Sequence, residues 1–217
     1  VQAELESALE RITGERIGLT VAGRTDAGVH ALAQVASFEH SGTLPDRLAE
    51  RLSAVLPPDV AVSAAEPAPD GFDARRDARS RTYRYRVLAS RARDPFEEHR
   101  ALWWRYPLDP ERLAACAAVT VGNHDFTAFT PTETAHVRFE REVMRCEWVR
   151  ADPILALEIE ADAFMRGMVR VLVGTMLEVG GARRSLDDFR ALLNGAARER
   201  AGETAPAHGL YLVSVAY

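Results

Sequence analysis

The 217-residue sequence contains no lysine, only two cysteines and no long apolar run. Cys116 and Cys146 have neither a CxxC partner nor the histidine spacing of a zinc site, so no metal site and no disulfide framework are predicted. Both are expected to be small buried residues. No stretch approaches the roughly 20 apolar residues of a membrane span, and no basic-then-apolar leader opens the sequence. We therefore expect a cytoplasmic protein without a membrane partner.

Glycine-rich nucleotide motifs are also absent. Neither G-x-G-x-x-G nor a P-loop occurs, so no cofactor is expected. The net charge of −5 argues against a protein that coats nucleic acid indiscriminately, because neutralising phosphates requires clustered cations. The arginines are nevertheless concentrated in one stretch: Arg75, Arg76, Arg79, Arg81, Arg84 and Arg86. This stretch is the candidate for a nucleic-acid contact, since the planar guanidinium suits phosphates and base edges.

Polar chemistry gathers between two runs that predict strands. An apolar run, 17–21, enters this segment and an alternating run, 34–39, leaves it, so a tight connection is expected between them. Arg24, Thr25 and Asp26 lie in that connection and can supply a charge clamp, a hydroxyl donor and a nucleophile or base. The same residue types also fit a plain turn in which Asp26 caps its own backbone.

The order of residues in this connection is more specific than their types. The run Gly-Arg-Thr-Asp-Ala-Gly-Val-His-Ala, residues 23–31, closely resembles the catalytic signature of the tRNA pseudouridine synthase A family. The resemblance implies that Asp26 is the single essential aspartate of a cofactor-free uridine isomerase, and Arg24, Thr25 and His30 are expected to contact its substrate. It also implies tRNA as the substrate, with uridine at positions 38 to 40 of the anticodon stem-loop, and a homodimer whose subunits both contact the tRNA.

A second segment combines aromatic and basic residues. From 80 to 88, Tyr83 and Tyr85 alternate with arginines, which predicts a strand with an aromatic face and a basic face. The arginines also fit a half-exposed strand whose charges are merely solvated. However, Phe-Asp-Ala-Arg at 72–75 followed by Tyr-Arg-Tyr at 83–85 resembles the second motif of the same family, which places the active-site tyrosine at Tyr83. We expect Arg75 and Arg84 to contact the RNA.

A third segment, 164–174, predicts the most apolar helix of the chain, with Arg166 and Arg170 on one face. Arg170 lies between two valines, where burial without a partner is expensive, although a surface arginine that extends into solvent fits the pattern too. Met-Val-Arg at 168–170 resembles the third synthase motif, which makes Arg170 the ion-pair partner of Asp26. Arg166 is expected to contact the substrate.

Apolar spacing and turn residues predict the rest of the fold. Helices are expected over 1–13, 45–56, 109–121 and 185–194, and strands over 60–64, 137–149 and 154–161 and at the C-terminus. His124 and Asp125 lie in a segment that resembles another family motif, and without a third ligand nearby they predict no metal. The expected class is α+β, with two ferredoxin-like halves, mainly antiparallel sheets and a central cleft. Residues 1–89 would form the N-terminal catalytic half that carries the Asp loop, and 90–217 the C-terminal half that completes the cleft.

One departure from the family pattern and two other functions bear on this prediction. In the family a strand and an Asp-Gly loop precede the helix that opens this sequence, so one strand of its sheet is expected to be missing here. The aromatic and basic strand also fits a non-catalytic RNA-binding module. An aspartyl-nucleophile hydrolase such as a glycosidase would need a second carboxylate, and no acidic residue accompanies Asp26 in its loop. Only the isomerase would release tritium from RNA labelled at uracil C5.

Overall fold

The computed structural model describes residues 1–134 and 137–217, which form two compact units. The first unit comprises Val1–Gly23 and Val35–Ala78, and the second comprises Arg24–Gln34 and Arg79–Tyr217. The Asp26 loop therefore packs with the second unit, although its flanking segments belong to the first. The functional division predicted at residue 89 stays a prediction, since these units reflect packing alone.

The first unit packs two helices over a small apolar core. α1 (Gln2–Thr13) contacts α2 (Leu48–Val55), and a two-stranded antiparallel sheet joins β1 (Thr20–Val21) to β3 (Ala36–Ser37). Leu9, Leu48 and Leu52 are buried at the centre of this core. The helical spacing of these leucines made both helices predictable, whereas the two strands are shorter than the runs 17–21 and 34–39 suggested.

The strand predicted at 60–64 is wrong. No strand is present there, and Val62 is held by a side chain instead of a ladder. The Ser53 hydroxyl accepts from the Val62 N–H at 2.9 Å and donates to the Val62 carbonyl at 3.1 Å. A polar group from α2 thus satisfies the backbone that the apolar pattern had assigned to a sheet.

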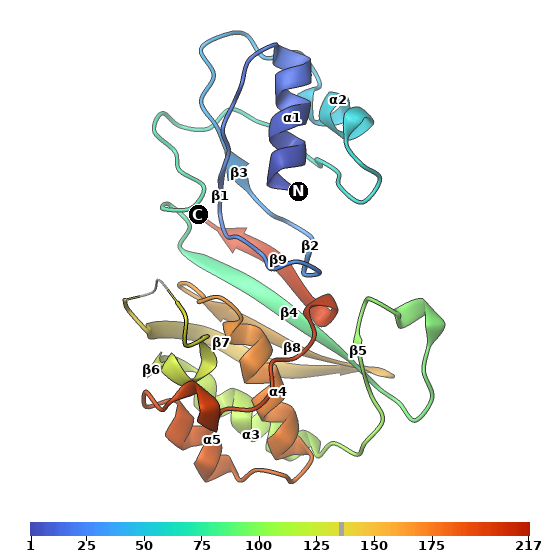
Figure 1. Ribbon diagram of the computed structural model, residues 1–217, viewed down its shortest axis with the longest axis vertical. Helices are drawn as coiled ribbons and strands as arrows, with labels where there is room; N and C mark the ends of the chain where they lie inside the picture. Colours follow the sequence, from blue (N-terminus) through green and yellow to red (C-terminus); the bar gives the residue numbers. More distant parts are fainter. Residues whose placement is uncertain (135–136) are drawn as a thin grey trace. The chain divides into compact units, whose positions relative to one another are not determined.

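The second unit contains a seven-stranded sheet in the order β2-β9-β4-β8-β7-β6, with β5 also paired to β4 (Figure 1). Its strands are β2 (His30–Ala31), β4 (Ser80–Ala89), β5 (Leu102–Trp104), β6 (Gly122–Asp125), β7 (Glu140–Ala151), β8 (Ile154–Ala161) and β9 (Leu210–Ala216). Only the β2–β9 and β4–β5 pairs are parallel. The predicted α+β class with a mainly antiparallel sheet is confirmed.

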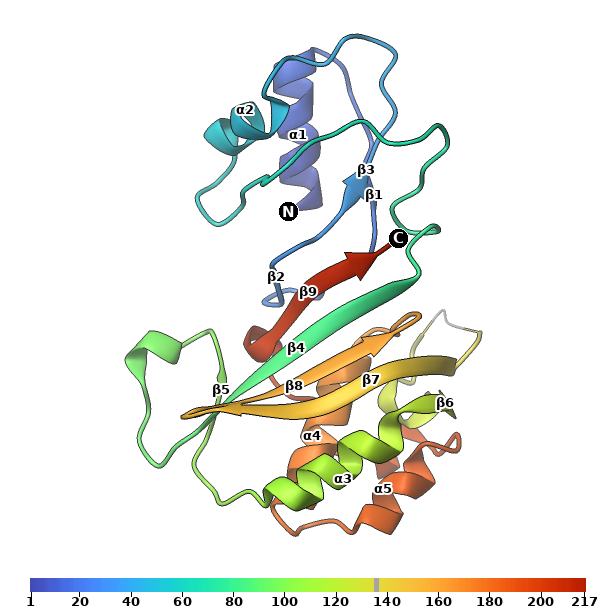
Figure 2. The same ribbon diagram turned by 180° about the vertical axis from the view of Figure 1, so that it is seen from behind.

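Three helices cover one face of this sheet, as Figure 2 shows from behind: α3 (Pro110–Thr120), α4 (Met168–Gly180) and α5 (Leu186–Leu192). The short 3-10 helices are η1 (Pro95–Glu97), η2 (Thr127–Phe129), η3 (Arg198–Arg200) and η4 (Ala207–Gly209). Asp109 caps α3 by accepting from the Glu111 and Arg112 N–H groups, as the sequence predicted. Ser185 caps α5 by accepting from the Asp188 N–H. The buried side chains of β4 pack with α4 in one core.

α4 begins later than the apolar run predicted. Gly167 precedes it with φ 71°, a left-handed conformation that interrupts the helix, so α4 runs from Met168 to Gly180 rather than from 164 to 174. Arg166 consequently lies ahead of the helix. The prediction that Arg166 and Arg170 share one helix face is wrong.

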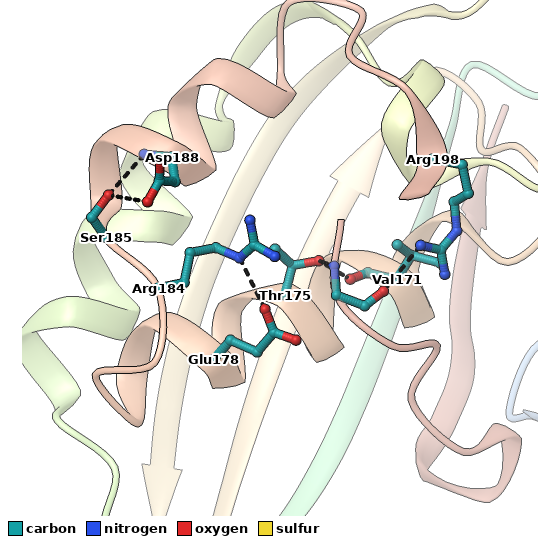
Figure 3. A network of polar contacts seen from close by, with 8 residues as sticks. Val171, Thr175, Glu178, Arg184, Ser185, Asp188 and Arg198 are labelled. Carbon is teal, nitrogen blue, oxygen red and sulfur yellow. Dashed lines mark hydrogen bonds and ion pairs between the residues drawn. The ribbon is translucent and has the colours of Figure 1, made fainter. Parts of the chain in front are cut away.

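Polar contacts fasten the segment after η3 to α4 (Figure 3). The Thr175 hydroxyl donates to the Val171 carbonyl at 2.7 Å and accepts from the Gly202 N–H at 3.0 Å. Arg198 then donates to the Gly202 carbonyl at 3.1 Å. These contacts fix the backbone that leads to Ala205 and Pro206, and both of those residues bond to side chains of the candidate site.

Candidate functional site

The Asp26 loop is held against β9 through the short edge strand β2. The Val29 N–H donates to the Asp26 carbonyl at 3.1 Å, which closes a turn in which Gly28 adopts φ 82°. Directly after this turn, β2 pairs in parallel with Tyr211 and Leu212 of β9. The catalytic-type aspartate therefore lies on a short turn whose far end is anchored by a sheet.

Asp26 forms an ion pair with Arg170 of α4. The distance from Arg170 Nη1 to Asp26 Oδ2 is 2.9 Å, and the two side chains are 19% and 34% exposed. The Arg170 Nε donates to the Ala205 carbonyl at 2.7 Å, and the Arg170 carbonyl accepts from the Ala205 N–H at 3.1 Å. The ion pair expected from the sequence is present. Because the Arg170 guanidinium donates both to Asp26 and to the Ala205 carbonyl, it fixes the orientation of the Asp26 carboxylate.

Tyr83 of β4 belongs to the same site. Its side chain is only 8% exposed and lies edge-on to Phe164, with ring centroids 5.0 Å apart. Burial raises the pKa of the Tyr83 phenol to about 12; the charge of Arg81 opposes this rise, and that of Asp26 adds to it. The phenol is therefore protonated at neutral pH and lies within the electrostatic reach of the Asp26 carboxylate.

Two backbone carbonyls complete the arrangement. Ala205 accepts from Arg170, and Pro206 accepts from the hydroxyl of Tyr85, which is fully buried, at 2.8 Å. Burial raises the pKa of Tyr85, and the positive charge of Arg170 opposes that rise. The role of Ala205 and Pro206 could not be predicted from the sequence, because it depends on their main-chain carbonyls and not on their side chains.

His30 already has two partners within the protein. Its ring stacks on Tyr211 with a centroid distance of 4.6 Å and an interplanar angle of 19°. Its Nε2 lies 2.9 Å from the His99 carbonyl, so the tautomer with hydrogen on Nε2 is the one that bonds. The expectation that His30 contacts substrate stays a prediction; in the structure its side chain ties the Asp26 loop to the segment before β5.

The remaining predicted contacts are distributed over both units. Arg24 is exposed and Thr25 half-buried, both next to Asp26 in the second unit. Arg166 is exposed, and its Nη2 lies 3.3 Å from the Glu133 carbonyl. Arg84 lies on β4 and donates to Glu158 at 2.6 Å and 2.9 Å. Arg75 is an exposed residue of the first unit.

Thiols and clusters of metal-binding side chains are the other reactive groups that a site of this kind could use. Cys116 and Cys146 are buried and unbridged, as predicted, and burial raises the pKa of each thiol to about 12. Neither is a thiolate at neutral pH. Within residues 1–134 and 137–217, no group of three or more His, Cys, Asp or Glu side chains could hold a metal ion. No helix in the same ranges is long and apolar enough to span a membrane.

The site therefore offers one carboxylate, one guanidinium and one protonated phenol. A carboxylate that is fixed in position by a cation can attack an electrophilic carbon or remove a proton. A glycosidase would instead place a second carboxylate across the scissile bond. The arrangement favours chemistry centred on Asp26 alone.

Comparison with known proteins identifies relatives over the whole chain. The family model described as tRNA pseudouridine synthase matches residues 116–217. The chain is 40% identical over 220 residues to tRNA pseudouridine synthase A of Bacillus velezensis, covering 100% of this chain and 89% of that protein. It is 44% identical over 223 residues to the protein of that name from Thermus thermophilus, covering 100% and 87%. The protein of the same name from Moorella thermoacetica is 42% identical over 219 residues, covering 100% and 89%.

Proposed function

The chain belongs to the tRNA pseudouridine synthase A family, and on that premise we propose that it isomerises uridine to pseudouridine in tRNA, with Asp26 as its essential carboxylate. The observation that carries the proposal is the ion pair between Asp26 and Arg170 at 2.9 Å, beside the buried phenol of Tyr83. By family resemblance, the target is uridine at positions 38 to 40 of the anticodon stem-loop.

The first step breaks the glycosidic bond from ribose C1′ to uracil N1. Positive charge develops on the sugar as the bonding pair leaves with N1, and one carboxylate beside C1′ can meet it in two ways. Asp26 either attacks C1′ to form an ester or removes the C2′ proton to give a glycal. Arg170 holds the carboxylate in position in both cases, because its guanidinium is itself fixed by the Ala205 carbonyl.

The second step rejoins the turned base through C5. The new C5–C1′ bond leaves a proton on C5 that must be lost, while N1 gains one, so the atoms balance without any cofactor. Tyr83 is the proposed group at C5. The pKa of the Tyr83 phenol is raised to about 12, so the phenol is protonated and can accept the C5 proton only if it passes its own proton to another acceptor at the same time. We propose Asp26 as that acceptor, because its charge contributes to the raised pKa of Tyr83.

Substrate contacts are proposed for residues of both units. A stacked uridine is unreachable, so the base must leave its stack and enter the site. Arg24 is proposed to hold a phosphate or to occupy the space that the base vacates, and Thr25 to donate a hydrogen bond. Arg75, Arg84 and Arg166 are proposed to contact the phosphates of the RNA. His30 is proposed to lie next to the base, because it anchors the loop that carries Asp26.

We also propose that the protein acts in the cytoplasm as a homodimer whose subunits both contact one tRNA. Light scattering of the purified protein, with and without tRNA, measures this directly. Twice the chain mass is expected for the free protein, and twice the chain mass plus that of one tRNA for the complex. The mass of one chain without tRNA, and of one chain plus one tRNA with it, would contradict the dimer.

Tritium release tests the activity. Transfer RNA labelled at uracil C5 should release tritium when the protein is added, and mapping of pseudouridine should locate the product at positions 38 to 40. A tRNA with cytidine at these three positions is the matched control and should release none. Absence of release from the labelled wild-type tRNA, with the protein folded, would refute the proposed activity.

A further inference from the structure

The segment between β4 and β5 extends beyond the end of β4 as a separate excursion, drawn in green in Figure 1. We refer to residues 90–101 as the arm. The arm contains η1 and carries Phe96, whose surface is 85% exposed. Single exposed apolar residues are ordinary on protein surfaces. What distinguishes this one is that the backbone carrying it is firmly held.

Four contacts fix the arm. Asp94 caps η1 by accepting from the Phe96 N–H at 2.9 Å, and Pro95 fixes the first helical φ. Glu97 pairs with Arg86 of β4 at 2.9 Å, with both side chains at most 24% exposed. The hydroxyl of Tyr211 donates to the Arg100 carbonyl at 2.8 Å.

The fourth contact comes from the Asp26 loop. His30 forms a hydrogen bond with the carbonyl of His99. The backbone of His99 has φ 58°, which is uncommon for a residue other than glycine. The arm is thus tied to β4, to β9 and to the loop of the catalytic carboxylate. Phe96 cannot be covered by local collapse without breaking these contacts.

Guanidinium groups lie next to aromatic rings on the arm and in the segment that follows it. Arg93 lies 4.6 Å from the ring centroid of Trp103, and Arg105 lies 5.0 Å from that of Tyr106, which is 58% exposed. Arg183 lies 5.5 Å from the ring centroid of Trp104. Exposed guanidiniums next to aromatic rings are typical of surfaces on which nucleic-acid bases stack.

The exposed charge of this region is positive although the chain is acidic. Within residues 90–106 one exposed side chain is acidic, that of Glu98, whereas four exposed side chains are basic: Arg91, Arg93, Arg100 and Arg105. Asp94 and Glu97 are half-buried and already engaged, one as a cap and the other in an ion pair. On a protein of net charge −5, this local excess of arginine favours a polyanion over a second acidic copy of the chain.

We infer that the arm is a preformed RNA-contacting element in which Phe96 stacks on a base of the substrate while Arg91 and Arg100 meet flanking phosphates. The inference rests on the proposed function, because it takes tRNA as the partner. It adds a contact that none of the three signature segments contains. Since His30 joins the arm to the Asp26 loop, a base held at Phe96 would be placed at a fixed position relative to the catalytic carboxylate.

The test measures tRNA affinity and tritium release of the full chain for three variants. Phe96→Ser should weaken tRNA binding between roughly 5-fold and 150-fold, the range of one lost base–aromatic stack. Phe96→Trp should restore wild-type affinity, because its ring also stacks. Val149→Ser, which removes another exposed apolar side chain (43% exposed) from β7, should leave affinity unchanged.

Two results would overturn the inference. One is wild-type affinity in Phe96→Ser. The other is a dimeric wild type that becomes monomeric in Phe96→Ser, which would assign the exposed ring to a second copy of the chain. Failure of the proposed function is distinguishable from both, because it would show as absent tritium release by the wild-type protein itself.

Discussion

Removing the Arg170 cation beside Asp26 should lower the free energy of unfolding, because two contacts of its guanidinium are lost. Arg170→Met keeps an unbranched apolar stem but loses the 2.9 Å ion pair to Asp26 and the 2.7 Å hydrogen bond to Ala205. Breaking a buried ion pair costs about 3–5 kcal/mol, and a hydrogen bond to a charged group contributes about 1.5–3 kcal/mol. Because the Asp26 side chain is 34% exposed, water can solvate part of its charge. We therefore expect the free energy of unfolding to fall by about 2–4 kcal/mol.

A double-mutant cycle isolates the ion pair from the bond to Ala205. Asp26→Asn, Arg170→Met and the double variant are unfolded in urea, and the coupling energy is the departure from additivity. We expect a coupling of about 1–2 kcal/mol, within the range measured for residues in contact. A coupling below about 0.3 kcal/mol, the scatter of independent sites, would refute the claim that Arg170 stabilises this carboxylate.

The chain provides a matched control for activity. Arg184 pairs with Glu178 of α4 at the same 2.9 Å, with side chains 19% and 23% exposed, as Figure 3 shows. Arg184→Met should lower stability by a similar amount yet leave pseudouridine formation unchanged. Arg170→Met should reduce turnover under conditions where both proteins are folded. Equal activity in the two variants would mean that Arg170 serves stability alone.

Three further predictions follow from the tyrosine and the arginines. Tyr83→Phe should retain most tRNA affinity but slow single-turnover tritium release severely, whereas Tyr83→Ala should also lose roughly 1–3 kcal/mol of binding in a filter assay; near-normal release by Tyr83→Phe would show that the ring only packs. Burial raises the pKa of Tyr83 from 10.0 to about 12, so between these pH values the folded protein keeps a proton that the unfolded chain loses. The free energy of unfolding should therefore contain a contribution of about 3 kcal/mol that is present below pH 10 and is lost as the pH rises through 12. Urea unfolding at pH 9 and pH 12 should show this loss in the wild type and a smaller one in Tyr83→Phe; equal losses would contradict the pKa shift. If the arginines from Arg75 to Arg86 contact RNA, the logarithm of the tRNA association constant should fall linearly with the logarithm of salt concentration, by roughly 0.7–0.9 per phosphate neutralised, and salt-insensitive binding would mean that they are only solvated surface.

Local patterns in the sequence were sufficient for the elements that carry the site. The alternation of Tyr83 and Tyr85 with arginines predicted β4, because one face of that strand is buried and the other is not. The Asp109-Pro110 start predicted α3, since a side-chain cap and a proline at the first turn are local features. The contact between Asp26 and Arg170 was reached through motif resemblance, because no local pattern joins residues 144 positions apart.

Non-local contacts account for what the sequence did not indicate. β2 consists only of His30 and Ala31, and it exists because β9 pairs with it from the far end of the chain. The start of α4 was missed because the apolar run continues through Gly167, whose left-handed φ of 71° interrupts the helix. The carbonyls of Ala205 and Pro206 receive Arg170 and Tyr85 through the path of the backbone, which residue types do not encode.

Asp26→Asn tests the central claim most directly. Amide and carboxylate are nearly equal in size, but only the carboxylate can attack C1′ or remove the C2′ proton. The measurement is pseudouridine formation and tRNA affinity of purified Asp26→Asn beside the wild type, both checked for folding by circular dichroism. We predict nearly unchanged tRNA affinity with no detectable pseudouridine. Substantial pseudouridine formation by Asp26→Asn, free of wild-type protein, would contradict the assignment of Asp26 as the catalytic carboxylate.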